Sequence, residues 1–71
     1  MKVVLDARKL ENKKDSHVYL KELFQFPEHY GNNLDALHDC LEEINSLEIQ
    51  IENEEEAGAY FRYVKRVLER L

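Results

Sequence analysis

The chain has 71 residues, of which 44% are hydrophobic and 35% are charged, and its formal net charge is −5. These values are typical of a small folded domain and exclude an intrinsically disordered chain. The apolar runs are far shorter than the ~20 residues that span a bilayer, no hydrophobic leader follows Met1, and the single cysteine, Cys40, cannot form an internal disulfide. We therefore expect one cytoplasmic domain, residues 1–71, that does not associate with membranes.

The positive charges are confined to the two ends of the chain. All ten Lys and Arg lie between residues 2 and 21 or between residues 62 and 70, whereas the forty residues from 22 to 61 contain eleven Asp or Glu and no Lys or Arg. Such a middle section projects a negative field, which argues against direct binding of nucleic acid and for a basic protein partner. The alternative interpretation is an acidic surface that is merely solvated.

The first third of the chain predicts a strand and a helix. Lys2 to Asp6, KVVLD, is a short β-branched run that is typical of a strand. Residues 17–25 place apolar side chains at helical spacing, and Asp15 or Ser16 can cap this helix by accepting a hydrogen bond from a first-turn N–H. Pro27 ends the helix, because proline has no N–H to donate and restricts the residue before it to an extended conformation.

The stretch from Pro27 to Ile44, PEHYGNNLDALHDCLEEI, predicts an irregular approach followed by a helix that Asn33 caps. Within the approach, Gly31 allows either a special backbone conformation or a close approach by another molecule. One apolar stripe of the helix faces the core and consists of Leu34, Leu37, Leu41 and Ile44. The outer face carries the carboxylates Asp35, Asp39, Glu42 and Glu43. Like charges one turn apart destabilise a helix, so helix stability does not explain this row of carboxylates.

The last third predicts a second strand and a last helix. Residues 47–52 alternate between apolar and polar side chains, as in a half-buried strand. Asn53 and Glu56 have the spacing of a capping box, which predicts a helix whose apolar positions begin at Ala57. Because two helices lie between the strands, we expect the strands to pair in parallel, with helices on the apolar face. The expected fold class is α/β, a small parallel sheet of two strands packed against about three helices.

Catalytic chemistry has little support in the sequence. Five side chains could be arranged as metal ligands, but they lack any recognised metal-binding spacing, and each histidine is interpreted as a surface or boundary residue: His17, His29, His38, Asp35 and Asp39. Asp35 and Asp39 could also form an acid–base pair, yet they lie on a convex helix, where water is hard to exclude. We therefore expect no enzymatic activity, no metal and no cofactor.

The run from Tyr30 to Leu41, YGNNLDALHDCL, resembles the barstar family, bacterial protein inhibitors of the ribonuclease barnase. The resemblance is most specific from Leu20 to Leu41 and extends more loosely from Lys2 to Glu52. It implies a barstar-like fold and an antitoxin-like role as the inhibitor of a basic ribonuclease. The residues support this reading, because carboxylates at fixed spacing can mimic RNA phosphates in a site lined by Arg, Lys and His.

The resemblance implies that Asp39 enters the nuclease phosphate site most deeply and that Asp35 makes a second charge contact. The full predicted partner-binding set is His29, Tyr30, Gly31, Asn33, Leu34, Asp35, Ala36, His38, Asp39, Glu42 and Glu43. The alternative is an acidic protein–protein interaction module that keeps the barstar scaffold and binds a different basic partner.

Departures from the family pattern favour an altered partner. His29 and His38 stand where the family has aromatic contact residues, and imidazoles make binding sensitive to pH between ~5 and 8. The chain looks like a shortened member: the family's C-terminal strand is absent from these residues, and only Glu69 weakly matches the acidic residues of the family's last helix. A two-stranded sheet leaves an exposed edge, so we expect a homodimer that covers this edge or the last helix.

Overall fold

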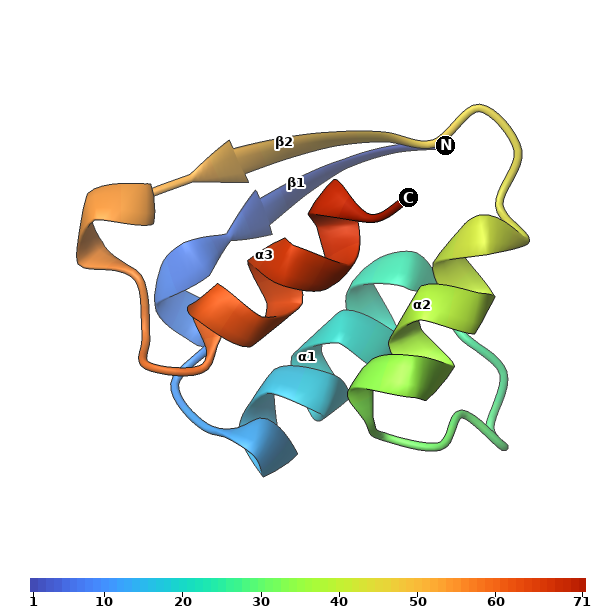
Figure 1. Ribbon diagram of the computed structural model, residues 1–71, viewed down its shortest axis with the longest axis horizontal. Helices are drawn as coiled ribbons and strands as arrows, with labels where there is room; N and C mark the ends of the chain where they lie inside the picture. The colour runs from blue at the N-terminus through green and yellow to red at the C-terminus, as the bar shows by residue number, and fades with distance from the viewer.

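A computed structural model describes residues 1–71 and confirms the small α/β fold. Its elements, in chain order, are β1 (Lys2–Asp6), the 3₁₀ turn η1 (Ala7–Lys9), α1 (Lys13–Phe24), α2 (Leu34–Glu42), β2 (Glu48–Glu52), the 3₁₀ turn η2 (Glu54–Glu56) and α3 (Phe61–Glu69). The two strands pair in parallel, with Val4 opposite Gln50. In Figure 1 the strands cross the top of the molecule and the three α-helices lie below them. None of these helices has the length and apolar character needed to cross a membrane.

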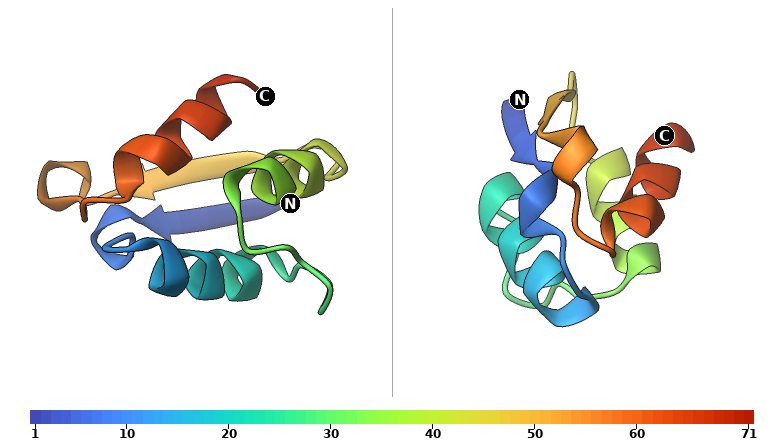
Figure 2. Two further views of the ribbon diagram at one scale, coloured as in Figure 1. Left: turned by 60° about the horizontal axis from the view of Figure 1, so that its bottom comes forward. Right: turned by 90° about the vertical axis from the view of Figure 1, so that its left-hand side faces the viewer.

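One face of the sheet is buried under the helices and the other faces solvent. On β1, Val3 and Leu5 are buried, whereas Val4 between them is 49% exposed. On β2, Ile49 and Ile51 are half-buried and point to the same face as Val3 and Leu5, because they occupy the same register. The two views of Figure 2 show α1 near β1, with α2 and α3 farther toward β2. The alternating pattern of the second strand therefore predicted its buried face correctly.

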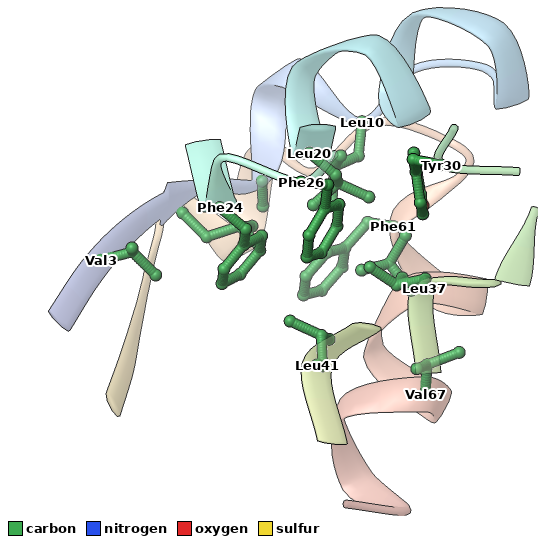
Figure 3. Close-up of a cluster of buried hydrophobic side chains, with 13 residues drawn as sticks. Val3, Leu10, Leu20, Phe24, Phe26, Tyr30, Leu37, Leu41, Phe61 and Val67 are labelled. Carbon is green, nitrogen blue, oxygen red and sulfur yellow. The ribbon is translucent and has the colours of Figure 1, made fainter. Parts of the chain in front are cut away.

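The core is formed where the three helices meet beneath the sheet. Figure 3 shows Phe24, the last residue of α1, beside Phe26, with Phe61 from α3 next to Phe26 and Leu37 from α2 on the side away from Phe24. The rings of Phe24 and Phe26 are stacked with centroids 5.4 Å apart, and the ring centroid of Tyr30 lies 4.7 Å from that of Phe26. The buried apolar cluster consists of Val3, Leu5, Ala7, Leu10, Leu20, Phe24, Phe26, Tyr30, Leu37, Leu41, Phe61, Val64 and Val67. The loop that precedes α2 is thus anchored in the core.

Helix α1 begins earlier than the sequence predicted, and neither Asp15 nor Ser16 is its N-cap. Asn12 caps it instead: its side-chain oxygen accepts a hydrogen bond from the N–H of Asp15 at 2.8 Å, and its amide donates to the Asp15 carboxylate at 3.0 Å. Ser16 is fully buried inside the helix. The sequence offered three capping residue types within five positions, and the exposed first turn gave no apolar signal to choose between them.

Helix α3 begins later than predicted, because the expected capping box of Asn53 and Glu56 does not form. Asn53 has a left-handed backbone (φ 59°), makes no capping hydrogen bond and donates to the Asp6 carboxylate at 3.1 Å. Gly58 then passes against Leu10 so closely that a Cβ would lie 2.3 Å from the Leu10 carbonyl oxygen. This crossing delays the helix to Phe61, so Ala57 lies outside it.

A groove of about 370 Å³ lies between β2 and the end of α3, beside the sheet edge that no third strand covers. All the side chains that line it are apolar: Leu41, Leu47, Ile49, Ile51, Leu68 and Leu71.

Candidate partner-binding surface

Asn33 fixes the start of α2, as the sequence predicted. Its side-chain oxygen accepts a hydrogen bond from the N–H of Ala36 at 2.7 Å, and its amide donates to the carbonyl of Gly31 at 3.2 Å. The same side chain therefore caps the helix and holds the end of the preceding loop. Asp35 lies in the first turn, where the helix dipole favours a negative charge.

The two faces of α2 separate apolar from acidic side chains. Leu37 and Leu41 are 0% and 2% exposed, so they fix the rotation of the helix against the core. The opposite face presents four exposed carboxylates: Asp35, Asp39, Glu42 and Glu43. The side chain of Asp39 is 79% exposed. The carboxylates thus stand on a helix that core packing holds in place, with their charged groups open to solvent.

The special backbone conformation in the loop before α2 belongs to Asn32 and not to Gly31. Asn32 has φ 53°, in the left-handed region that asparagine tolerates better than most residues, whereas no glycine in the chain has a positive φ. Gly31 lies against the first turn of α2, where an added Cβ would stand 3.2 Å from the Cβ of Ala36. A side chain at position 31 would therefore crowd the first turn of α2.

Tyr30 supports the loop from inside, although the sequence predicted it as a partner contact. It is 5% exposed, and its hydroxyl lies 2.7 Å from Nδ1 of His17. The other ring nitrogen of His17, Nε2, lies 2.9 Å from the hydroxyl of Tyr60, just before α3. His17 is fully buried, so its interpretation as a surface or boundary residue was wrong. A single imidazole thus joins α1, the loop and the start of α3.

Burial changes the proton affinity of this buried group of side chains. Burial, and after it the positive charge of Lys13, lowers the pKa of His17. Burial also raises the pKa of Tyr30 and of Tyr60, so both remain phenols at neutral pH. A neutral imidazole has one donor and one acceptor nitrogen, and hydroxyls can match either role, so both ring nitrogens are satisfied.

The other two histidines lie at the rim of the acidic face. His29 is exposed, whereas His38 is half-buried with Nδ1 3.4 Å from a Glu42 carboxylate oxygen and 3.9 Å from an Asp39 oxygen. When protonated, His38 forms an ion pair with these carboxylates. Ligand atoms of His38, Asp39 and Glu42 lie within 4.8 Å of one another, a spacing compatible with a metal ion, although exposed acidic groups commonly take this arrangement without one.

Cys40 is half-buried on the same helix. Burial, followed by the charges of Glu43 and Asp39, raises the pKa of its thiol, which disfavours the reactive thiolate.

Helix α3 contributes residues to this surface that the sequence did not predict. A groove of about 640 Å³ separates α2 from α3. Its α2 wall consists of Leu34, Asp35, His38 and Asp39, and its α3 wall of Tyr63, Arg66, Val67 and Arg70. The α3 residues recur at i, i+3, i+4 and i+7, which was a visible signal for one helix face. Only the packing of the two helices brings this face beside Asp35 and Asp39.

Comparison with known proteins identifies the family. The family model described as barstar (barnase inhibitor) matches residues 1–70. The chain belongs to the barstar family. This match reaches through α3, whereas the residue-level resemblance extended only to Glu52, so α3 is part of the barstar region.

A related protein carries a functional name. The Bacillus subtilis (strain 168) protein named "Putative ribonuclease inhibitor YrdF" is 50% identical over 40 residues, which cover 56% of this chain and 44% of that relative. The aligned region therefore spans less than half of the relative's length. No solved structure matches the chain.

Proposed function

We propose that this barstar-family protein inhibits a basic ribonuclease by occupying its active site. The exposed carboxylate row on α2, next to a loop that core contacts hold in place, is the observation that carries the proposal. Membership of the barstar family and the name of the related Bacillus subtilis protein support an inhibitory role.

The proposed mechanism is phosphate mimicry without catalysis. Asp39 takes the position of an RNA phosphate in the nuclease site, and Asp35, one helical turn away, provides a second negative group. Arg, Lys and His side chains that normally bind phosphate donate charge-assisted hydrogen bonds to these carboxylates. Because α2 is fixed by Leu37, Leu41 and the Asn33 cap, little conformational entropy is lost when the carboxylates are bound.

The residues around these two carboxylates complete the proposed contact surface. Gly31, Asn33, Leu34 and Ala36 form the loop and first turn next to Asp35. His29, His38, Glu42 and Glu43 form the rim. Tyr30 acts from the core and positions the loop.

The test is inhibition of a barnase-type ribonuclease by the purified protein at two salt concentrations. We expect Asp39→Ala to weaken inhibition at least about thirtyfold, because losing one partner of a buried charge pair costs about 2–5 kcal/mol. Asp35→Ala should have a smaller effect of the same sign. Glu55→Ala is the matched control, since it removes an exposed carboxylate in η2, away from the surface.

The outcomes separate the proposal from its alternative. Salt-sensitive inhibition that Asp39→Ala abolishes, with the fold intact by circular dichroism, supports active-site occupation. Equal loss in Asp39→Ala and Glu55→Ala would indicate a general charge effect and contradict the assigned site. Absence of inhibition at micromolar protein would favour a barstar scaffold that binds another basic protein, consistent with His29 and His38 at positions where the family has aromatic residues.

A further inference from the structure

The groove between α2 and α3 has walls of opposite charge. Asp35 and Asp39 line one side, and Arg66 and Arg70 line the other. All four side chains belong to exposed residues, and the groove is open to solvent. The helices themselves are held together beneath it, because Leu37 and Leu41 on α2 and Val64 and Val67 on α3 are buried in the shared core. Core packing therefore fixes the relative position of the two helices that carry the charged walls.

The arginines on the α3 wall are available to a partner. The ion pairs of the structure are Lys2 with Glu48, Asp6 with Arg8, His38 with Asp39 and with Glu42, and Glu54 with Lys65. Neither Arg66 nor Arg70 is among them, and no hydrogen bond joins either guanidinium to the opposite wall. Lys65, by contrast, is held 2.7 Å from a Glu54 oxygen.

Building on the proposed function, we propose that Arg66 and Arg70 determine which ribonuclease the protein inhibits, by binding carboxylates that border the nuclease's cationic active site. The α2 wall enters the cationic site, and the α3 wall meets an acidic patch beside it. The partner is thus a nuclease with both charges on its surface, arranged in the order of the two walls.

Charge complementarity is the physical basis for this selection. Arginine binds carboxylates through two parallel N–H donors, which adds geometric specificity to the attraction. A nuclease that is basic on both sides of its active site would instead place its cations against Arg66 and Arg70. Like charges brought together in an interface strongly oppose binding, so the same two residues would reject such a nuclease.

A simpler role for the arginines would be to weaken the negative field of α2, and the two roles predict opposite results. The experiment measures association and dissociation rates for a catalytically disabled barnase-type ribonuclease with wild-type protein and with the double variant Arg66→Glu, Arg70→Glu. If the arginines only weaken the field, their reversal makes the protein more acidic and accelerates association with a basic nuclease. If they contact carboxylates, reversal accelerates dissociation, because lost or repulsive contacts act mainly on that rate.

Arg62→Glu provides the matched control. Arg62 is exposed on α3 but does not line the groove, so its reversal changes net charge without changing the proposed contact. We expect the double variant to dissociate on the order of a hundredfold faster than wild type, and Arg62→Glu to dissociate at the wild-type rate. Replacing the acidic residues that border the nuclease site with lysine should restore binding of the double variant.

The results also distinguish this inference from the proposed function. Unchanged or tighter binding by the double variant, while Asp39→Ala still abolishes binding, would overturn the role of Arg66 and Arg70 and leave the inhibitor function standing. Failure of the wild-type protein to bind any barnase-type ribonuclease would overturn both.

Discussion

The buried imidazole of His17 makes the stability of the protein depend on pH. Its folded-state pKa lies below the ordinary value of 6.5, because burial disfavours the charged form and Lys13 adds positive charge nearby. The unfolded chain therefore binds more protons than the folded one as pH falls toward and below 6.5. The contribution of neutral His17 to stability is fully present at higher pH. It is lost as pH falls through this range, until the folded imidazole also binds its proton.

We expect the free energy of unfolding to fall by up to about 1.4 kcal/mol per pH unit through this imidazole alone. Urea unfolding between pH 5 and pH 8, compared for wild type and His17→Gln, measures the effect. Glutamine retains hydrogen-bonding groups but does not titrate, so the difference between the two proteins should shrink as pH falls. A constant difference across the pH range would show that His17 does not titrate as inferred.

The residues of the acidic face could be predicted because their positions follow from local periodicity. Asp35 and Asp39 are four residues apart on a helix whose apolar stripe faces the core, so their exposure follows directly. Tyr30 and His17 could not be placed in this way. Their contact depends on how the loop packs over α1, and a tyrosine beside turn-forming residues resembles an exposed loop residue in sequence. Arg66 and Arg70 were not predicted as part of this surface, because β2 and η2 separate them from α2 in the chain. Only the packing of α3 against α2 brings them near the acidic residues.

The presence of the strands and helices was predicted better than the residues at which the helices begin. The alternation of apolar and polar residues predicted β2, and helical spacing predicted the core face of α2, because each pattern extends over several residues. A helix start depends on one cap or one close crossing. In α1 the capping asparagine was one of several suitable residues, and in α3 the start is set by a backbone contact with Leu10 that no local pattern reveals.

That crossing predicts a large effect for Gly58→Ala. The added methyl group would overlap the Leu10 backbone, which cannot move like a flexible side chain, and the hydrogen bonds from Gly58 to Ala7 and from Tyr60 to Leu10 hold both segments in place. We expect unfolding to become easier by about 1–3 kcal/mol or more, as in other overpacked sites. Thermal or urea denaturation provides the measurement.

Gly31→Ala is the matched control for this substitution. Its new Cβ would meet the Ala36 side chain at 3.2 Å, a contact that a small shift of the exposed loop relieves. Its effect on stability should therefore be smaller. The reverse order of the two effects would contradict the assigned role of Gly58.

For the whole molecule, the apolar groove beside β2 predicts self-association of the 71-residue chain. Of the two routes that the sequence suggested, fully overlapped antiparallel pairing of two β2 strands is disfavoured, because this register is centred on Gln50 and would place Glu48 opposite Glu52 of the second copy. The groove lined by Leu47, Leu68 and their apolar neighbours is the better surface. We therefore propose a homodimer through this groove, which leaves Arg66 and Arg70 outside the interface.

Sedimentation or light scattering across micromolar concentrations tests the proposed dimer. We expect a concentration-dependent dimer for wild type, which Leu68→Lys converts to monomer because it places a charge in the groove. Asp39→Ala, on a different surface, should leave the association unchanged. A wild-type chain that remains monomeric throughout this range would contradict the proposal.

The opposite charges on the two walls of the α2–α3 groove also make the charge distribution of the surface asymmetric. Negative charge lies on one side and positive charge on the other, so the surface carries an electric dipole that runs from one helix to the next. A partner with the matching charge order is turned toward the correct alignment while the two proteins are still separated by solvent, and one approaching the wrong way round is repelled at both walls. In the binding mode proposed above, this dipole would orient the partner, as well as discriminate between partners, before any side chains touch.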